Sequence, residues 1–131
     1  MSNKLDKILA EISAGELIDK ITILEIKKIK INDSSKQKEV NKELSSLNNT
    51  LKKFIPDISL IEKQKNELKN INLRLWDIEN GKRKAEKLNN FGEDFIKLAR
   101  EVYKANDLRA KTKLEINNIL GSNIVEVKSH D

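Results

Sequence analysis

Three segments of the chain carry charged and polar side chains at helical spacing, and these residue types could bind a ligand or one another. In the first, Asp19, Thr22 and Glu25 recur every third residue within an otherwise apolar stretch. Such spacing places side chains along one face of a helix. The second segment holds Trp76, the single tryptophan, and the third is a polar stripe around Arg109. Carboxylates and cations on such faces can form ion pairs or hold a small anion.

The candidate ligand-binding residues are the charged, amide and aromatic side chains of these three segments. They are Asp19, Glu25, Trp76, Asp77, Glu79, Arg83, Tyr103, Asn106, Arg109, Lys113 and Asn117. If a bundle gathers these residues around Trp76 and Tyr103, the cations Arg83, Arg109 and Lys113 could hold an anionic or polar ligand. The alternative is a buried network whose members satisfy one another and fix the helix register. We favour the network, although the residues alone leave both interpretations open.

Two ion pairs are predicted within these segments. Glu79 and Arg83 are four residues apart, in the order that favours a helical ion pair. Arg109 shares a helix face with the apolar Val102, Ala105 and Ile116. Since a buried charge without a partner is very costly, we expect its guanidinium to meet a carboxylate. The candidates for that partner are Asp19, Glu25, Asp77 and Glu79.

No constellation typical of an enzyme or a metal site emerges from the rest of the chain. There is no cysteine, and the single histidine, His130, lies beside the C-terminus. Neither a Cys–His nor a Ser–His–Asp arrangement can be assembled credibly, and no glycine-rich phosphate loop is present. We therefore expect no catalytic residue, no metal and no cofactor. His130 is interpreted as a solvated tail residue.

Composition limits the classes of partner. The 131 residues include 26 Lys and Arg against 21 Asp and Glu, a net charge of +5. This excess is spread along the chain, whereas a nucleic-acid-binding surface needs a clustered patch. No apolar run approaches the roughly 20 residues that span a bilayer, and the first residues do not resemble a secretory signal. We expect a cytoplasmic protein that neither binds nucleic acid nor inserts into a membrane.

The segments must be positioned by helices, whose ends the sequence marks. Ser13 and Glu16 have the spacing of a capping box and begin the first helix. A heptad pattern of apolar residues from 40 to 54 defines the second, which Pro56 terminates. A third helix is expected over about 58–88, with a kink or break at Gly81 as an open alternative.

A fourth helix is expected from Glu93 to Leu120, with Gly121 at its C-terminal cap. The prediction is a single all-α domain over 1–131, an antiparallel bundle of four helices of which two are long. Residues 8–12 and 124–127 are rich in Ile and Val, and a short β-ribbon between them is a further expectation. Because the heptad of the second helix is a surplus apolar seam, we also predict a homodimer or small oligomer, buried through that helix and the first half of the third.

The same segments resemble a family of small uncharacterised bacterial proteins, a domain of unknown function. The resemblance runs from about Ile8 to Ser129, and the residues that carry it lie in the ranges 13–27, 75–79, 102–110 and 116–129. It implies a genomic context, because members of that family are encoded near glycosyltransferase and surface-polysaccharide genes. The leading expectation is therefore a non-catalytic interaction or scaffold module with a protein partner, linked to surface-glycan assembly.

A weaker likeness suggests an alternative function. The polar line that begins at Glu16 and the cations of an all-helical chain are similar to the helical chorismate mutases. Those enzymes bind a dicarboxylate through several cationic side chains. The four arginines here lie at 74, 83, 100 and 109, so the arginine that such enzymes carry on the first helix has no counterpart. The alternative expectation is an anion-binding protein or a chorismate-mutase-like enzyme, with its site at the Trp76/Tyr103 cluster.

Overall fold

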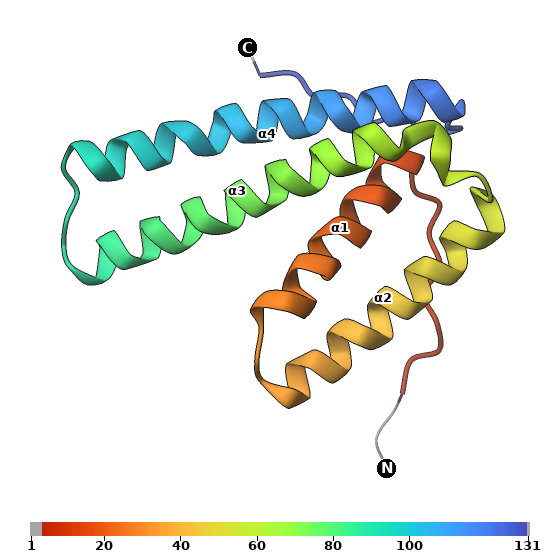
Figure 1. Cartoon of the computed structure of the whole chain (residues 1–131), viewed down its shortest axis with the longest axis horizontal. Helices are drawn as coiled ribbons and strands as arrows, with labels where there is room; N and C mark the ends of the chain where they lie inside the picture. Colours follow the sequence, from red (N-terminus) through yellow and green to blue (C-terminus); the bar gives the residue numbers. More distant parts are fainter. Residues whose placement is uncertain (1–3, 131) are drawn as a thin grey trace.

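A computed structural model describes residues 4–130, which fold into two antiparallel helical hairpins (Figure 1). The elements are α1 (Ala14–Lys30), α2 (Ser34–Phe54), a short 3-10 helix η1 (Ile58–Ile61), α3 (Glu62–Lys87) and α4 (Glu93–Leu120). The pair α3 and α4 forms the longer hairpin, and α1 and α2 form the shorter one, set at an angle to it. No strand occurs within residues 4–130. The predicted all-α architecture with four helices is confirmed.

The helix ends lie where the polar caps of the sequence predict them. The hydroxyl of Ser13 accepts a hydrogen bond from the backbone N–H of Glu16 at 3.0 Å, which caps α1. Asp33 caps α2 in the same way through the N–H of Ser35, and Asp57 caps η1. At the end of α4, Gly121 takes the left-handed conformation with φ of 62°, which glycine adopts without steric cost.

Gly81 does not break the third helix into separate elements, and α3 continues through it to Lys87. The glycine instead allows a close approach between the two long helices. A Cβ added at Gly81 would lie 3.2 Å from the Cδ1 atom of Leu98 on α4. The helical hydrogen bonds and this packing outweigh the entropic cost of a glycine in a helix interior.

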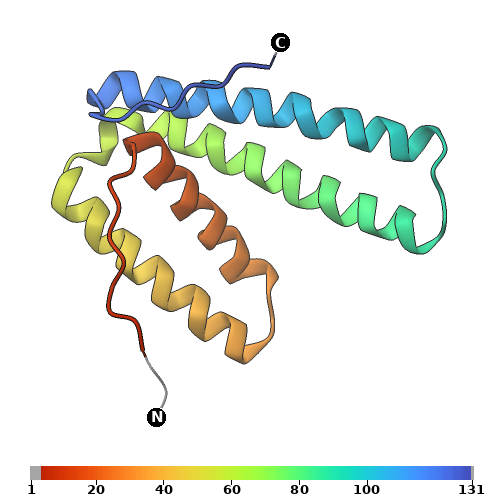
Figure 2. The same ribbon diagram turned by 180° about the vertical axis from the view of Figure 1, so that it is seen from behind.

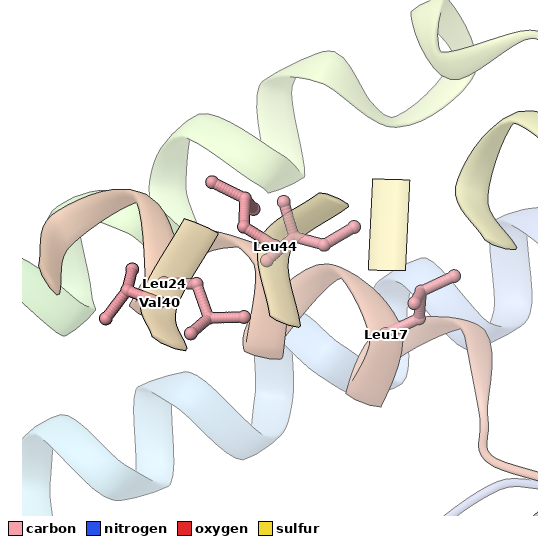
Figure 3. Close-up of a cluster of buried hydrophobic side chains, with 5 residues drawn as sticks. Leu17, Leu24, Val40 and Leu44 are labelled. Atoms are coloured by element: carbon pink, nitrogen blue, oxygen red, sulfur yellow. The ribbon is translucent and has the colours of Figure 1, made fainter. Parts of the chain in front are cut away.

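The apolar core is built on both sides of α1. One side packs Leu17, Ile21 and Leu24 against Val40 and Leu44 of α2, and Figure 3 shows Leu24 and Val40 meeting there. The other side contributes Ile18 to a second cluster, whose other buried members are Ile61, Leu68 and Ile116. The first helix is therefore the element that joins the two hairpins.

This packing removes the premise of the predicted dimer. That prediction treats the heptad seam of α2 as surplus apolar surface, but its residues Val40, Leu44, Leu47 and Leu51 pack against the core of their own chain. Only Phe54, at the end of the seam, is left largely exposed. A homodimer remains a prediction, and of the α2 heptad Phe54 is the residue left to contribute to its interface.

The predicted terminal β-ribbon is wrong, because residues 8–12 and 124–127 are not strands. The two terminal segments diverge from the beginning of α1, as Figure 2 shows. The N-terminal segment crosses α2, whereas the C-terminal segment turns at Gly121 and runs back along α4. Side chains hold the latter in place, since Lys128 forms an ion pair with Asp107 of α4 at 2.9 Å.

Candidate functional site

The carboxylate of Asp19 lies at the centre of the only polar site that joins α1, α3 and α4 within residues 4–130. Its side chain is fully buried. Arg109 donates two hydrogen bonds to it, from Nε to Oδ1 at 2.9 Å and from Nη2 to Oδ2 at 2.5 Å. This two-bond geometry is the strongest that a guanidinium and a carboxylate form. The prediction that Arg109 pairs with a carboxylate, with Asp19 among the candidates, is confirmed.

Asn72 of α3 completes the coordination of this carboxylate. Its amide nitrogen donates to Oδ1 of Asp19 at 2.9 Å and lies 3.0 Å from the hydroxyl oxygen of Thr22. The Thr22 hydroxyl in turn donates to the backbone carbonyl of Asp19 at 2.8 Å. One carboxylate therefore ties three helices together, and we call Asp19, Thr22, Asn72 and Arg109 the central network.

Lys113, one turn after Arg109 on α4, connects this network to the beginning of α1. Its ammonium nitrogen lies 2.5 Å from Oε2 of Glu16, 3.7 Å from Oε1 of Glu126 and 4.0 Å from Oδ2 of Asp19. The Glu16 side chain therefore turns to Lys113 and Lys20. An ammonium group among three carboxylates offsets the repulsion that they would otherwise exert on one another.

The beginning of α1 is held by α4 and the C-terminal segment. The N–H of Gly15 donates to Oδ1 of Asn117 at 2.6 Å, and the N–H of Ala14 donates to the Ser122 hydroxyl at 3.0 Å. Glu126 accepts hydrogen bonds from Ser13 and, at 3.0 Å, from Asn117. Backbone donors that a helix start leaves unpaired are thus satisfied from elsewhere in the chain.

The surroundings of Arg109 in the central network and of Glu126 at the beginning of α1 favour the charged forms of both groups. Hydrogen bonds to Asp19 raise the pKa of Arg109 above its ordinary value, against the opposing effect of burial. For Glu126, burial acts to raise the pKa, but hydrogen bonds from Ser13 and Asn117 and the charge of Lys113 outweigh it and lower the pKa. Within residues 4–130 every buried side-chain nitrogen and oxygen has a hydrogen-bond partner. The buried polar atoms of the site are therefore all paired, and the Asp19 carboxylate at its centre is shielded from solvent.

We predict that Glu126→Gln removes an acid-sensitive part of the stability. Folding lowers the pKa of the Glu126 carboxylate below its ordinary value of 4.5. The carboxylate therefore stabilises the folded protein at any pH above 4.5, and this stabilisation is lost as the pH falls through the lowered pKa. At pH 7 the variant should lose about 1 kcal/mol, since the group is only partly buried. Urea unfolding between pH 3 and 7 should show wild type and variant converging at the acid end. An unchanged gap at pH 3, or a Glu86→Gln control that behaves like the variant, would contradict this.

A family model matches residues 8–131 of the chain, described as a family of unknown function, DUF6165. The chain belongs to this family. Searches of curated proteins and of solved structures found no match. The matched range includes all four helices, the central network and the residues that hold the beginning of α1. The family description gives no activity.

Of the candidates predicted for this DUF6165 chain, the structure brings four together, namely Asp19, Arg109, Lys113 and Asn117. Glu25 lies further along α1 and forms ion pairs with Lys65 and Lys69 of α3 at 3.9 and 3.6 Å. Its role is thus a separate, half-exposed contact between two helices.

No hydrogen bond or ion pair within residues 4–130 joins the remaining candidates around Trp76 and Tyr103, and the cluster that the sequence suggested stays a prediction. Trp76, Glu79 and Asn106 are half-buried, whereas Asp77, Arg83 and Tyr103 are exposed. The predicted Glu79–Arg83 ion pair is absent from residues 4–130, where Glu79 pairs with Lys82 at 3.6 Å. Arg83 is exposed.

Asn72 is the member of the central network that sequence reasoning missed. It lies four residues after the buried Leu68, and Ile71 lies three residues after it. Both positions fit an apolar helix seam, and periodicity alone favours the apolar residue. Ser122 and Glu126 also have no predicted role, because they follow the last helix and only the tertiary structure returns them to α1.

Residues 4–130 contain no group of three or more His, Cys, Asp or Glu side chains that could hold a metal ion. In the same part of the chain, no helix is long and apolar enough to cross a membrane. A shallow hollow of about 560 Å³ lies between α4 and the C-terminal segment, and Lys111, Lys113, Lys128 and His130 contribute to its lining.

Proposed function

We propose that this chain is a non-catalytic helical interaction module, in which the central network is a structural brace. The observation that carries the proposal is the closed geometry around Asp19. Its carboxylate accepts hydrogen bonds from Arg109 and Asn72, and no buried polar side-chain atom of residues 4–130 is without a partner. A brace of this kind fixes how α1 sits between the two hairpins, and so fixes the outer surface that a partner would meet.

The pairing of the cations argues against a ligand at the same place. Arg109 is engaged by Asp19, and Lys113 by Glu16 and Glu126. An anion that took over Arg109 would leave the fully buried Asp19 carboxylate without its main partner, and such a group is strongly destabilising. Anchoring residues of a ligand site are expected to face a cavity; Lys113 contributes to the hollow beside α4, but Arg109 does not.

For the partner, we propose a protein of surface-glycan assembly, met in the cytoplasm, and a homodimer as the form of the module itself. The support for the first is the resemblance of the motif-bearing segments to proteins encoded in that genomic context. The support for the second is the apolar side chains that the fold leaves exposed at the two terminal segments, among them Leu5, Ile8, Leu9 and Val127.

The second candidate function, binding of a small anion, has one specific observation in its favour. Three lysines and His130 contribute to the lining of the hollow between α4 and the C-terminal segment, beside the carboxylates of Asp107 and Glu126. Lys113 and Lys128 have carboxylate partners. Such a ligand would therefore depend on Lys111 and His130, away from Trp76 and Tyr103.

Titration with inorganic phosphate and with malonate separates the two candidates. If the site is a brace, amide NMR spectra of the full chain should show no saturable shifts with either anion at millimolar concentration. Saturable shifts at Lys111 and Lys113, abolished by Lys111→Gln with the melting temperature retained, would contradict the proposal and favour anion binding.

A further inference from the structure

An apolar groove lies at the end of the molecule where α2 and α4 finish, beside the N-terminal segment. Its volume is about 940 Å³, and its apolar lining includes Leu9, Ile12, Leu17, Phe54, Leu60 and Leu120. Phe54 and Leu60 are 69% and 59% exposed, so the side chains of this wall are open to solvent. A concave surface of this size and character is typical of a docking site.

The N-terminal segment beside this groove carries apolar side chains that the fold does not cover. Leu5, Ile8 and Leu9 are 85%, 82% and 87% exposed. They are spaced i, i+3 and i+4, which places them on one face if the segment becomes helical, although residues 4–12 are not helical in the monomer. Such a three-residue face is the anchor pattern with which an amphipathic helix enters an apolar groove.

We propose that the groove receives the N-terminal segment of a second copy of this chain, with Leu5, Ile8 and Leu9 as its anchors. The inference deepens the proposed function, on which it rests, by naming the surface through which the module associates. Groove and segment are neighbours in each copy, because Leu9 and Ile12 line the groove. Two copies can therefore exchange segments about one two-fold axis, and the assembly closes as a dimer.

The charges around the two surfaces are complementary. Residues 4–9 carry Lys4, Asp6 and Lys7, all exposed, for a net charge of +1, whereas Glu11 and Asp57 lie at the groove. A segment that enters the groove of its partner brings its lysines toward these carboxylates. Exposed pairs of this kind add little affinity but favour one orientation over others.

Sedimentation equilibrium of the full chain tests the proposal, with Leu9→Asp as the variant. Because Leu9 is exposed, the substitution should leave the monomer folded, as circular dichroism would show. Wild type should sediment at twice the chain mass of 15.1 kDa, and Leu9→Asp should raise the dimer Kd at least about tenfold. Ile29→Asp is the matched control, since Ile29 is an exposed apolar residue at the other end of α1. It should leave the Kd unchanged.

Cross-linking then identifies the contact, because the native chain has no cysteine. A Leu9→Cys chain mixed with a tagged Leu60→Cys chain should form a mixed disulfide, whereas Ile29→Cys with Leu60→Cys should not. A chain that is still monomeric at about 100 µM, a concentration well above common micromolar dissociation constants, would overturn the inference. Binding of a small apolar probe in the groove of that monomer would also overturn it. A dimer that Leu9→Asp does not weaken and that lacks the mixed disulfide would also overturn it. Neither result bears on the brace, which the anion titration and the stability of Arg109→Met test separately, whereas a monomer would also refute the homodimer of the proposed function.

Discussion

Arg109→Met should lower the free energy of unfolding by about 3 kcal/mol or more, because it leaves a fully buried carboxylate without its main partner. Asp19 is 0% exposed, and after the substitution its nearest cation is Lys113 at 4.0 Å. Methionine keeps the volume and helix propensity of the site, so the loss reports the charge rather than the packing. Urea unfolding at pH 7 measures it directly.

The control for this prediction is Arg100→Met, at an exposed position on the same helix. Surface substitutions of this kind change stability by about 0.5 kcal/mol or less. If Arg109→Met lost no more than the control, the central network would not be a brace. A loss confined to anion binding, with the stability retained, would instead identify Arg109 as part of a ligand site.

Gly15→Ala should destabilise the fold by about 2 kcal/mol, within the range of overpacked sites. A Cβ at this position would lie 2.5 Å from the backbone carbonyl oxygen of Lys113 and 3.0 Å from Oδ1 of Asn117. Backbone atoms of α4 cannot move aside as a flexible side chain can. The beginning of α1 would have to move away from α4. The hydrogen bond from the N–H of Gly15 to Oδ1 of Asn117, now 2.6 Å, would then lengthen or break.

Gly92→Ala provides the comparison at a glycine without such crowding. Its added Cβ would meet only Oδ1 of Asn90, at 3.6 Å, and its φ of −79° suits alanine. Because Gly92 is the N-cap of α4, where alanine is less favourable than glycine, we expect this variant to lose only about 0.5 kcal/mol, well below the loss at Gly15. Equal losses for the two variants in thermal or urea unfolding would mean that the contact at Gly15 carries no special cost.

The helices could be predicted from the sequence because their signals are local. Ser13, Asp33 and Asp57 each cap the element that follows them, and Gly121 ends the last helix as its type predicts. Each of these depends on a few consecutive residues and on hydrogen bonds within them. The ion pair between Arg109 and a carboxylate was also predictable, because a charge on an apolar face requires a partner.

What depends on the arrangement of elements in space could not be predicted in the same way. The heptad of α2 has the pattern of an interface between chains, yet α1 of the same chain covers most of it. Periodicity shows that a helix face is apolar, but not which surface meets it. Asn72 was missed for a related reason, since it and Ile71 both fit the seam of α3 and the rotation of that helix decides between them.

The terminal segments show the same limit. An Ile- and Val-rich sequence favours a strand, but a strand also needs a neighbour. The N-terminal segment lies across α2, whereas the C-terminal segment leaves the end of α4 and runs back along it. Side-chain contacts of Glu126 and Lys128 with the helical body set the path of the C-terminal segment instead.

The most direct test of the brace is a double-mutant cycle between Asp19→Asn and Arg109→Met, followed by urea unfolding at pH 7. The amide introduced by Asp19→Asn would be neutral and could still accept the hydrogen bond from Asn72, so Arg109→Met should cost far less in its presence. We predict that the double variant is more stable than the sum of the single losses implies, by about 2 kcal/mol, within the range of directly contacting residues. Losses that add to within about 0.5 kcal/mol, as for independent sites, would contradict the claim that this ion pair holds the fold together.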